Sequence, residues 1–331
     1  MRRRDFVRGI VGSTVAWPLT VRAQQPKNVA RIGFLLTPSL KSPEAIVLLN
    51  AFQQGLHELG YMEGTNILIE SRGADSKVER FPALATELVQ LKLDVIVASN
   101  TLAARAVRQA TSITPIVVPV MGDPVGDGLV ASLAQPGGNI TGLTFLGPQL
   151  VAKRLALLKD ALPTASRIAG LWHPGAYGER TMSGMMEEAE AAARTLGLQL
   201  QLIAVQGPDD FERAFSTIEA GSDALMVFPS PMIFTERRRI VGLATHRRLP
   251  SIAMAREFAE LGGLIAYGAN IPDLVRRSSI YVDKIIKGAK PADLPVEQPT
   301  KFELVINLKT AREFGLSISR DFLLIADEVI E

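Results

Sequence analysis

The chain has 331 residues, 47% of them hydrophobic and 21% charged, and it contains no cysteine. This composition is ordinary for a globular protein with a sizeable core, and the length favours two domains. The absence of cysteine excludes disulfide bonds, thiolate metal sites, cysteine nucleophiles and a lipid-modified N-terminal cysteine. Five arginines and one aspartate fall within residues 1–23, so loss of that segment would change the formal charge from +2 to −2. The remainder has no basic stripe, and we expect no nucleic-acid partner.

The N-terminal residues have the features of an export signal. Residues 3–8 contain a twin-arginine pattern, and the apolar stretch 9–19 that follows is too short to span a bilayer as a stable helix. Residues 21–23 place small or aliphatic side chains where signal peptidase cleaves. These features predict a Tat-type (twin-arginine) signal cleaved after Ala23, and a protein that works in the periplasm. The alternative is a basic N-terminal tail on a cytoplasmic protein.

The first half of the remaining chain alternates strand signals with helix signals. Ser42 is expected to cap a helix with Pro43 at its first position, and Ser76 with Glu79 forms a predicted capping box. Strands are expected at residues 31–36, 66–70, 94–98 and 116–120, and helices at 43–59, 77–91 and 101–110. Such regular alternation predicts a parallel sheet that is covered by helices on both faces.

The alternation restarts after a break near residues 140–150. Strands are expected at 168–172, 200–205, 224–228, 251–254 and 264–267, with helices at 148–162, 179–196, 208–218 and 232–247. A helix at 272–287, a polar Pro-rich connection at 290–299 and a strand at 302–306 follow. A strand after two complete arrays predicts that the chain passes between two lobes more than once. We therefore expect an α/β fold of two Rossmann-like lobes with parallel sheets, in which lobe 1 comprises 29–147 and 270–290, and lobe 2 with the hinge comprises 148–269 and 291–331.

Motifs that would indicate an enzyme or a bound cofactor are weak. Residues 126–131 fit a loose G-x-G-x-x-A dinucleotide pattern, but the Pro-Gly-Gly at 136–138 cuts its helix short. The sequence has no P-loop and no G-x-S-x-G motif, and its three scattered histidines make no zinc site. We expect no cofactor and no metal. Asp127 is expected to cap a helix, and the arginines at 237–239 to form a solvated helix face.

Polar residues follow several predicted strands, at the position where an open α/β sheet binds small ligands. Ser99, Asn100 and Thr101 begin a helix, whose free N–H groups and dipole favour an anion such as a carboxylate. Asp123 is placed to accept hydrogen bonds from an ammonium group. The candidate ligand contacts are Thr37, Ser39, Ser99, Asn100, Thr101, Asp123, His173, Ser230, Arg256 and Tyr267. Ordinary turn chemistry is the alternative for each of these loops.

Four segments, residues 123–142, 153–158, 263–268 and 285–316, resemble the ABC-transporter substrate-binding family that includes tryptophan-binding members. The likeness covers nearly the whole chain after the export signal. It implies a type I periplasmic binding fold, with two lobes hinged by three crossovers and one ligand site between them. It also implies delivery of the ligand to a membrane permease and its ATPase, and a monomer is usual for this fold. Many relatives are lipoproteins, whereas this chain lacks the cysteine for lipid attachment, which favours a freely diffusing form.

We therefore expect a periplasmic receptor that captures a small organic solute by lobe closure. A carboxylate-bearing solute, such as an amino acid or an aromatic acid, is favoured by the residues at 99–101 opposite Asp123 and Arg256. Two other interpretations remain open. One is a periplasmic α/β enzyme, such as an isomerase or hydrolase, that uses Asp123 or His173. The other is a ligand sensor that feeds a signalling partner instead of a permease.

Overall fold

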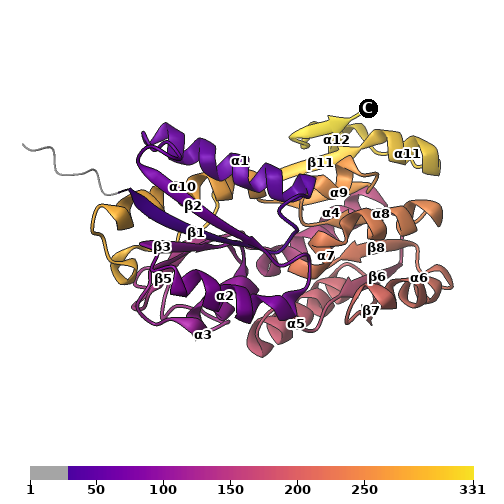
Figure 1. Ribbon diagram of the computed structural model, residues 1–331. Helices are drawn as coiled ribbons and strands as arrows, with labels where there is room; N and C mark the ends of the chain where they lie inside the picture. Colours follow the sequence, from indigo (N-terminus) through magenta and orange to yellow (C-terminus); the bar gives the residue numbers. More distant parts are fainter. Residues whose placement is uncertain (1–28) are drawn as a thin grey trace, which may run out of the picture.

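The computed structural model describes residues 29–331, and the predicted export signal with its cleavage point lies outside them. Two α/β lobes lie side by side, each built around its own sheet (Figure 1). Among the residues described, none of the helices combines the length and apolar character needed to span a bilayer.

The first lobe contains five parallel strands in the order β2-β1-β3-β4-β5. They are β1 (Ala30–Leu36), β2 (Ile67–Gly73), β3 (Val95–Ala98), β4 (Ile116–Met121) and β5 (Ile140–Thr144). Helix α1 (Pro43–Glu58) covers one face, and α2 (Phe81–Gln90) and α3 (Thr101–Ala110) cover the other (Figure 1). Helix α10 (Ile271–Ile286), which is distant in sequence, packs beside α1 and against β4 and β5.

The second lobe contains seven strands in the order β12-β11-β10-β9-β8-β6-β7. All neighbours in this sheet are parallel except β10 and β11. Its strands are β6 (Arg167–Trp172), β7 (Gln199–Ala204), β8 (Ala224–Val227), β9 (Ser251–Ala253), β10 (Ile265–Gly268), β11 (Glu303–Asn307) and β12 (Glu328–Ile330). Its helices are α4 (Val151–Ala161), α5 (Glu179–Thr195), α6 (Phe211–Glu219), α7 (Pro231–Thr235), α8 (Arg237–His246), α9 (Arg256–Glu260), α11 (Leu308–Phe314) and α12 (Arg320–Leu324).

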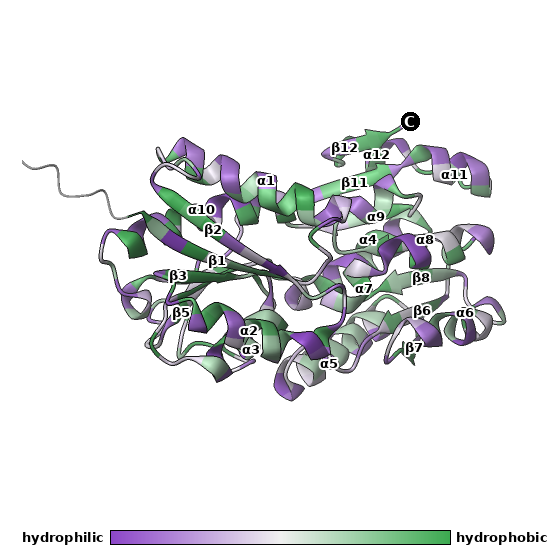
Figure 2. Ribbon diagram, viewed as in Figure 1, coloured by the Kyte–Doolittle hydropathy of each residue, from purple (hydrophilic) through white to green (hydrophobic). Residues whose placement is uncertain are grey.

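The hydropathy of the elements explains this layering. The central strands are apolar, whereas the helices carry polar outer faces (Figure 2). Every residue of β3 and of β8 is buried, as expected for parallel strands that are covered on both faces. The predicted α/β class with two mostly parallel sheets is therefore confirmed.

Within residues 29–331 the chain passes between the lobes three times. It leaves the first lobe after β5, returns after β10 to form α10, and leaves again before β11. The last connection runs along the first lobe as far as Glu297, whose N–H donates to the Gly142 carbonyl at 3.0 Å. The three passages bring the carboxyl ends of both sheets to one interlobe region, where open α/β sheets bind ligands.

Local capping agrees with the sequence at α1 but not at α2. The Ser42 hydroxyl accepts from the Ala45 N–H at 3.2 Å, with Pro43 at the first helical position. The predicted capping box at Ser76 is wrong, because Ser76 adopts a left-handed backbone with φ of 63° and α2 begins later, at Phe81. A residue with that backbone cannot take the extended conformation of an N-cap.

The helix expected at 232–247 is broken into α7 and α8 at Glu236. The Arg237 guanidinium donates to the Phe234 carbonyl at 2.9 Å. A continuous helix would pair that carbonyl with the N–H of Arg238. The break turns the Arg237 side chain toward the first lobe, with consequences for the site.

Candidate ligand-binding site

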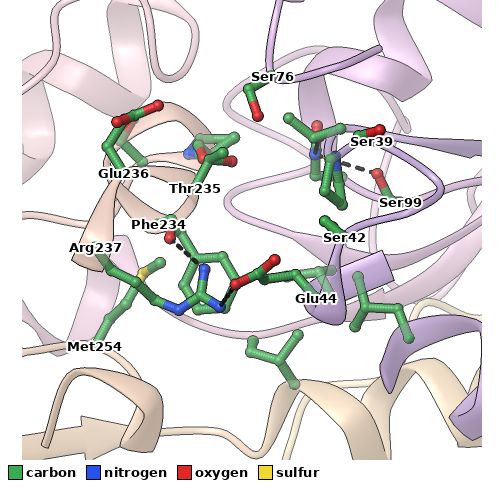
Figure 3. Close-up of a pocket in the computed structure, with 18 of the residues that line it drawn as sticks. Ser39, Ser42, Glu44, Ser76, Ser99, Phe234, Thr235, Glu236, Arg237 and Met254 are labelled. Atoms are coloured by element: carbon green, nitrogen blue, oxygen red, sulfur yellow. Dashed lines mark hydrogen bonds and ion pairs between the residues drawn. The ribbon is translucent and has the colours of Figure 1, made fainter. Parts of the chain in front are cut away.

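A cavity of about 580 Å³ lies between the two lobes (Figure 3). Its volume falls within the range of roughly 300–1,000 Å³ that is typical of small-molecule sites. Both lobes contribute to its wall. First-lobe lining residues include Thr37, Ser39, Ser42, Glu44, Ser76, Ser99, Asn100 and Thr101, and second-lobe ones include Tyr177, Ser230, Phe234, Arg237 and Met254.

The polar part of the wall in the first lobe is organised around Asn100, the N-cap of α3. Its Oδ1 accepts from the N–H groups of Leu102 at 3.0 Å and Ala103 at 3.2 Å. Its Nδ2 donates to Thr37 Oγ1 at 2.6 Å and also lies 3.3 Å from Ser99 Oγ. These bonds fix hydroxyl and amide groups at the positive end of a ten-residue helix, where negative charge is favoured.

The second lobe contributes a buried hydroxyl and an apolar surface. Ser230, which is fully buried, caps α7 by accepting from the Ile233 N–H at 3.4 Å. Its Oγ also lies 3.2 Å from His173 Nδ1, so His173 stands behind the wall. Burial lowers the pKa of His173, which favours the neutral imidazole. Tyr177, Phe234 and Met254 then give this side of the cavity an apolar, partly aromatic character.

An ion pair crosses the cavity between the lobes. Arg237 Nη2 lies 2.9 Å from Glu44 Oε1, at the first turn of α1 (Figure 3). Arg238 Nε lies 3.5 Å from the same oxygen. Burial alone would raise the pKa of Glu44, but the backbone at the start of α1 and the two arginines more than offset it, and the pKa is lowered. The expectation of a solvated arginine face is wrong for Arg237, which is only 6% exposed.

Six of the ten candidate contacts come together at this cavity. They are Thr37, Ser39, Ser99, Asn100, Thr101 and Ser230. The strands that precede these residues end at the facing edges of the two sheets, where open α/β sheets bind ligands.

The other four candidates lie outside the cavity lining. Arg256 faces acidic residues of its own lobe and pairs with Glu260 at 2.9 Å and with Glu328 at 2.8 Å. The Tyr267 ring packs against Phe302, with 6.0 Å between centroids. His173 lies behind Ser230, as described above. Asp123 accepts from the N–H of Gly126 at 2.8 Å within its own loop.

Several residues that line the cavity were not among the predicted ligand contacts. Glu44, Phe234, Arg237 and Met254 lie on helices or just beyond a strand, where an apolar or charged residue usually has a packing or solvent role. The only local signal was the run of arginines at 237–239, which does not distinguish a cavity from solvent. Across residues 29–331, no cluster of three or more histidine, aspartate or glutamate side chains is placed to hold a metal ion.

Comparison with protein families shows which family the chain belongs to. Residues 36–330 match the model described as ABC transporter substrate binding protein. The chain belongs to this family. Its members are binding proteins rather than enzymes, and they work with ABC transporters on small-molecule ligands.

Relatives of this family member include a "Tyrosine-binding protein" from Clostridioides difficile (strain R20291). It is 24% identical over 295 residues, which cover 89% of this chain and 82% of the relative. A crystal structure of an ABC domain in complex with L-Trp from Streptococcus pneumonia is 28% identical with a TM-score of 0.83. The likeness covers 91% of this chain and 99% of that one. The predicted type I periplasmic binding fold is thereby confirmed.

A third relative shares the fold. It is the ligand-free, open structure of a substrate-binding protein with adhesive properties from Clostridium difficile, which is 23% identical. The likeness covers 92% of this chain and 99% of that one, but the TM-score is only 0.67.

Proposed function

We propose that this protein captures a carboxylate-bearing solute, of the kind represented by aromatic amino acids, and presents the closed form to an ABC permease and its ATPase. One observation carries the proposal. The interlobe cavity combines the polar cluster at the start of α3 with aromatic and thioether side chains of the opposite lobe. Relatives named for tyrosine and bound to L-Trp support the same ligand class.

Each part of such a ligand has a matching part of the cavity. The carboxylate is assigned to Ser99, Asn100 and Thr101, where the dipole of α3 favours negative charge. The ring is assigned to the surface that includes Tyr177 and Phe234, and aromatic pairs add to the burial of apolar area. A ligand that contacts both lobes binds the closed form better than the open one, and only such a difference shifts the equilibrium toward closure.

The proposal extends to location. Residues 1–23 would direct the folded chain through the twin-arginine route, and cleavage after Ala23 would leave a freely diffusing periplasmic protein. Substitution of both Arg3 and Arg4 by Lys should retain the chain in the cytoplasm, as measured by cell fractionation. Normal periplasmic recovery of that double variant would contradict the assignment.

The ligand assignment is tested by calorimetric titration of residues 24–331 with L-tryptophan, L-tyrosine and tryptamine, which lacks the carboxylate. Asn100→Asp is the decisive variant. It keeps an acceptor for the cap of α3 but adds a negative charge beside the proposed carboxylate site. We expect at least about tenfold weaker binding of the two amino acids and no loss for any tryptamine binding. Asn50→Ala, an exposed position on α1, is the control. Equal affinity of Asn100→Asp and wild type for L-tryptophan would refute the assignment.

A further inference from the structure

The loop at residues 123–128, which follows β4 in the first lobe, contacts the start of α5 in the second. Asp127 Oδ1 accepts from the Gly178 N–H at 2.6 Å and from Arg105 Nη2 at 3.0 Å. The Asp127 side chain has no exposed surface, and its Oδ2 has no hydrogen-bond partner among the described residues. The expectation that Asp127 caps a helix is wrong, because Asp127 is the N-cap residue of none of the described helices, and the Gly178 N–H that donates to it belongs to the opposite lobe.

The electrostatics of this contact depend on the lobes being together. Asp127 faces the positive end of α5, a 17-residue helix whose N-cap is Gly178. When the lobes separate, the carboxylate loses the Gly178 N–H and regains water. A second link, at 3.4 Å between Thr181 Oγ1 and Asp123 Oδ2, joins the same two segments. Both carboxylates of the 123–128 loop thus face the opposite lobe instead of the ligand cavity.

The same contact fixes one wall of the cavity. Tyr177, the residue before Gly178, lines the cavity and is 6% exposed. Its ring packs directly on the backbone of Gly122, since a Cβ at Gly122 would lie 2.4 Å from Tyr177 Cε1. The lobes therefore approach each other at two glycines, with Asp127 beside one of them.

We propose that Asp127 is a positioning residue that holds the closed state and places Tyr177 against the ligand. It acts through the Gly178 backbone and does not itself line the cavity. The inference rests on the proposed function only in that it takes the closed state as the ligand-bound one. The segment Asp-Pro-Val-Gly-Asp, residues 123–127, thereby has a role in lobe closure. The position of Asp123 after a strand predicts a ligand contact instead.

Gly178→Ala is a selective test. Gly178 has an ordinary extended backbone, with φ of −68°, so alanine is compatible with the lobe itself. Its Cβ would lie 2.9 Å from Asp127 Oδ1 and 3.0 Å from Arg105 Nη2, which obstructs only the closed contact. Gly184→Ala on the same helix is the matched control, because a Cβ there meets no atom within 4 Å. Asp127→Asn, which removes the charge that faces Arg105, is the second variant.

Closure is measured by the distance between spin labels at Ile113→Cys and Glu188→Cys, two exposed positions in opposite lobes of a chain without native cysteine. Gly178→Ala and Asp127→Asn should each bind L-tryptophan about tenfold more weakly than Gly184→Ala. At an L-tryptophan concentration near the wild-type Kd, both should also lose much of the short-distance population. The melting temperature of the two ligand-free variants should match that of the wild type, whereas Gly184→Ala, which removes a glycine from the interior of α5, should melt slightly higher.

When L-tryptophan binds the wild type, two results would overturn the inference. One is an unchanged Kd with an unchanged distance distribution in both variants. Another is an equal loss of ligand-free melting temperature and affinity, which would mean that the contact supports the fold and not closure. If neither L-tryptophan nor L-tyrosine binds the wild type, the proposed ligand class fails by itself. The ligand-free distance distributions then decide, and Gly178→Ala must lose a short-distance component that the wild type samples.

Discussion

Arg154 on α4 is a fully buried arginine, and among residues 29–331 it makes no ion pair with a carboxylate. Its Nε donates to the Tyr267 carbonyl and its Nη1 to the Gly147 carbonyl, both at 2.8 Å. These carbonyls belong to two of the segments where the chain passes between the lobes. We predict that Arg154 ties the two passages together, and that its planar fork matters more than its charge.

The magnitudes decide between the two variants that test this. Burial lowers the pKa of Arg154 from 12.5 to about 10, which corresponds to a charging cost of roughly 3 kcal/mol. Two hydrogen bonds from a charged donor contribute about 1.5–3 kcal/mol each. Arg154→Met loses both bonds but also loses the charging cost, so the net destabilisation is about 0–3 kcal/mol. Arg154→Lys keeps a more strongly hydrated charge and cannot reproduce the fork, so we expect about 2–4 kcal/mol.

The assay is thermal unfolding of residues 24–331 at pH 7, followed by circular dichroism. At roughly 2–4 °C per kcal/mol, the lysine variant should melt about 4–16 °C below wild type, and no higher than the methionine variant. Lys153→Met, at the exposed neighbouring position, should change stability by less than about 0.5 kcal/mol. A lysine variant as stable as wild type, together with a destabilised methionine variant, would refute the reasoning, because charge alone would then suffice.

Three further outcomes follow from single contacts. Glu44→Gln removes the charge that Arg237 pairs with across the cavity, so it should weaken L-tryptophan binding about tenfold in a calorimetric titration while leaving the ligand-free melting temperature within about 1 °C. Backbone N–H groups hold the pKa of Asp223 well below its usual range. The ionised carboxylate therefore stabilises the fold above about pH 4, and this stabilisation is lost as the pH falls. The melting-temperature deficit of Asp223→Asn should accordingly shrink at acid pH. Gly268→Ala would place a Cβ 1.8 Å from the Met254 carbonyl oxygen, so urea unfolding should show a loss of more than about 3 kcal/mol or no soluble protein.

The fold was predictable where a buried strand produces a continuous apolar run. The strand expected at 116–120 is β4 with one more residue, and Pro43 begins α1 as its position after Ser42 predicts. The C-terminal elements α12 and β12 were not predicted, because a five-residue helix and a three-residue strand are too short to show a period. Because Glu328 of β12 pairs with Arg256 and holds it away from the cavity, the position of Arg256 could not be inferred without β12.

The site itself was predictable only in its polar part. Hydroxyl and amide side chains at strand ends fall on the cavity because sheet topology alone brings those ends together. The apolar and charged walls depend instead on the angles between helices of different lobes. Phe234 and Arg237 face the cavity because the helix breaks at Glu236, which no pattern in the sequence indicates.

The cross-lobe contacts also limit how strongly the empty protein can close. Reversal of a 1:99 population takes about 5.5 kcal/mol, and a charge-assisted hydrogen bond contributes roughly 1.5–3 kcal/mol. Two such bonds at full strength, one at Glu44 and one at Asp127, would therefore come close to shutting the lobes without a ligand. The structure weakens both, since the Glu44 side chain is 19% exposed and one oxygen of Asp127 is buried without a partner among the described residues. Under the proposed function, the contacts to the solute then decide the equilibrium between the open and closed forms. The cross-lobe contacts at Glu44 and Asp127 set only how much binding free energy the solute contacts must supply.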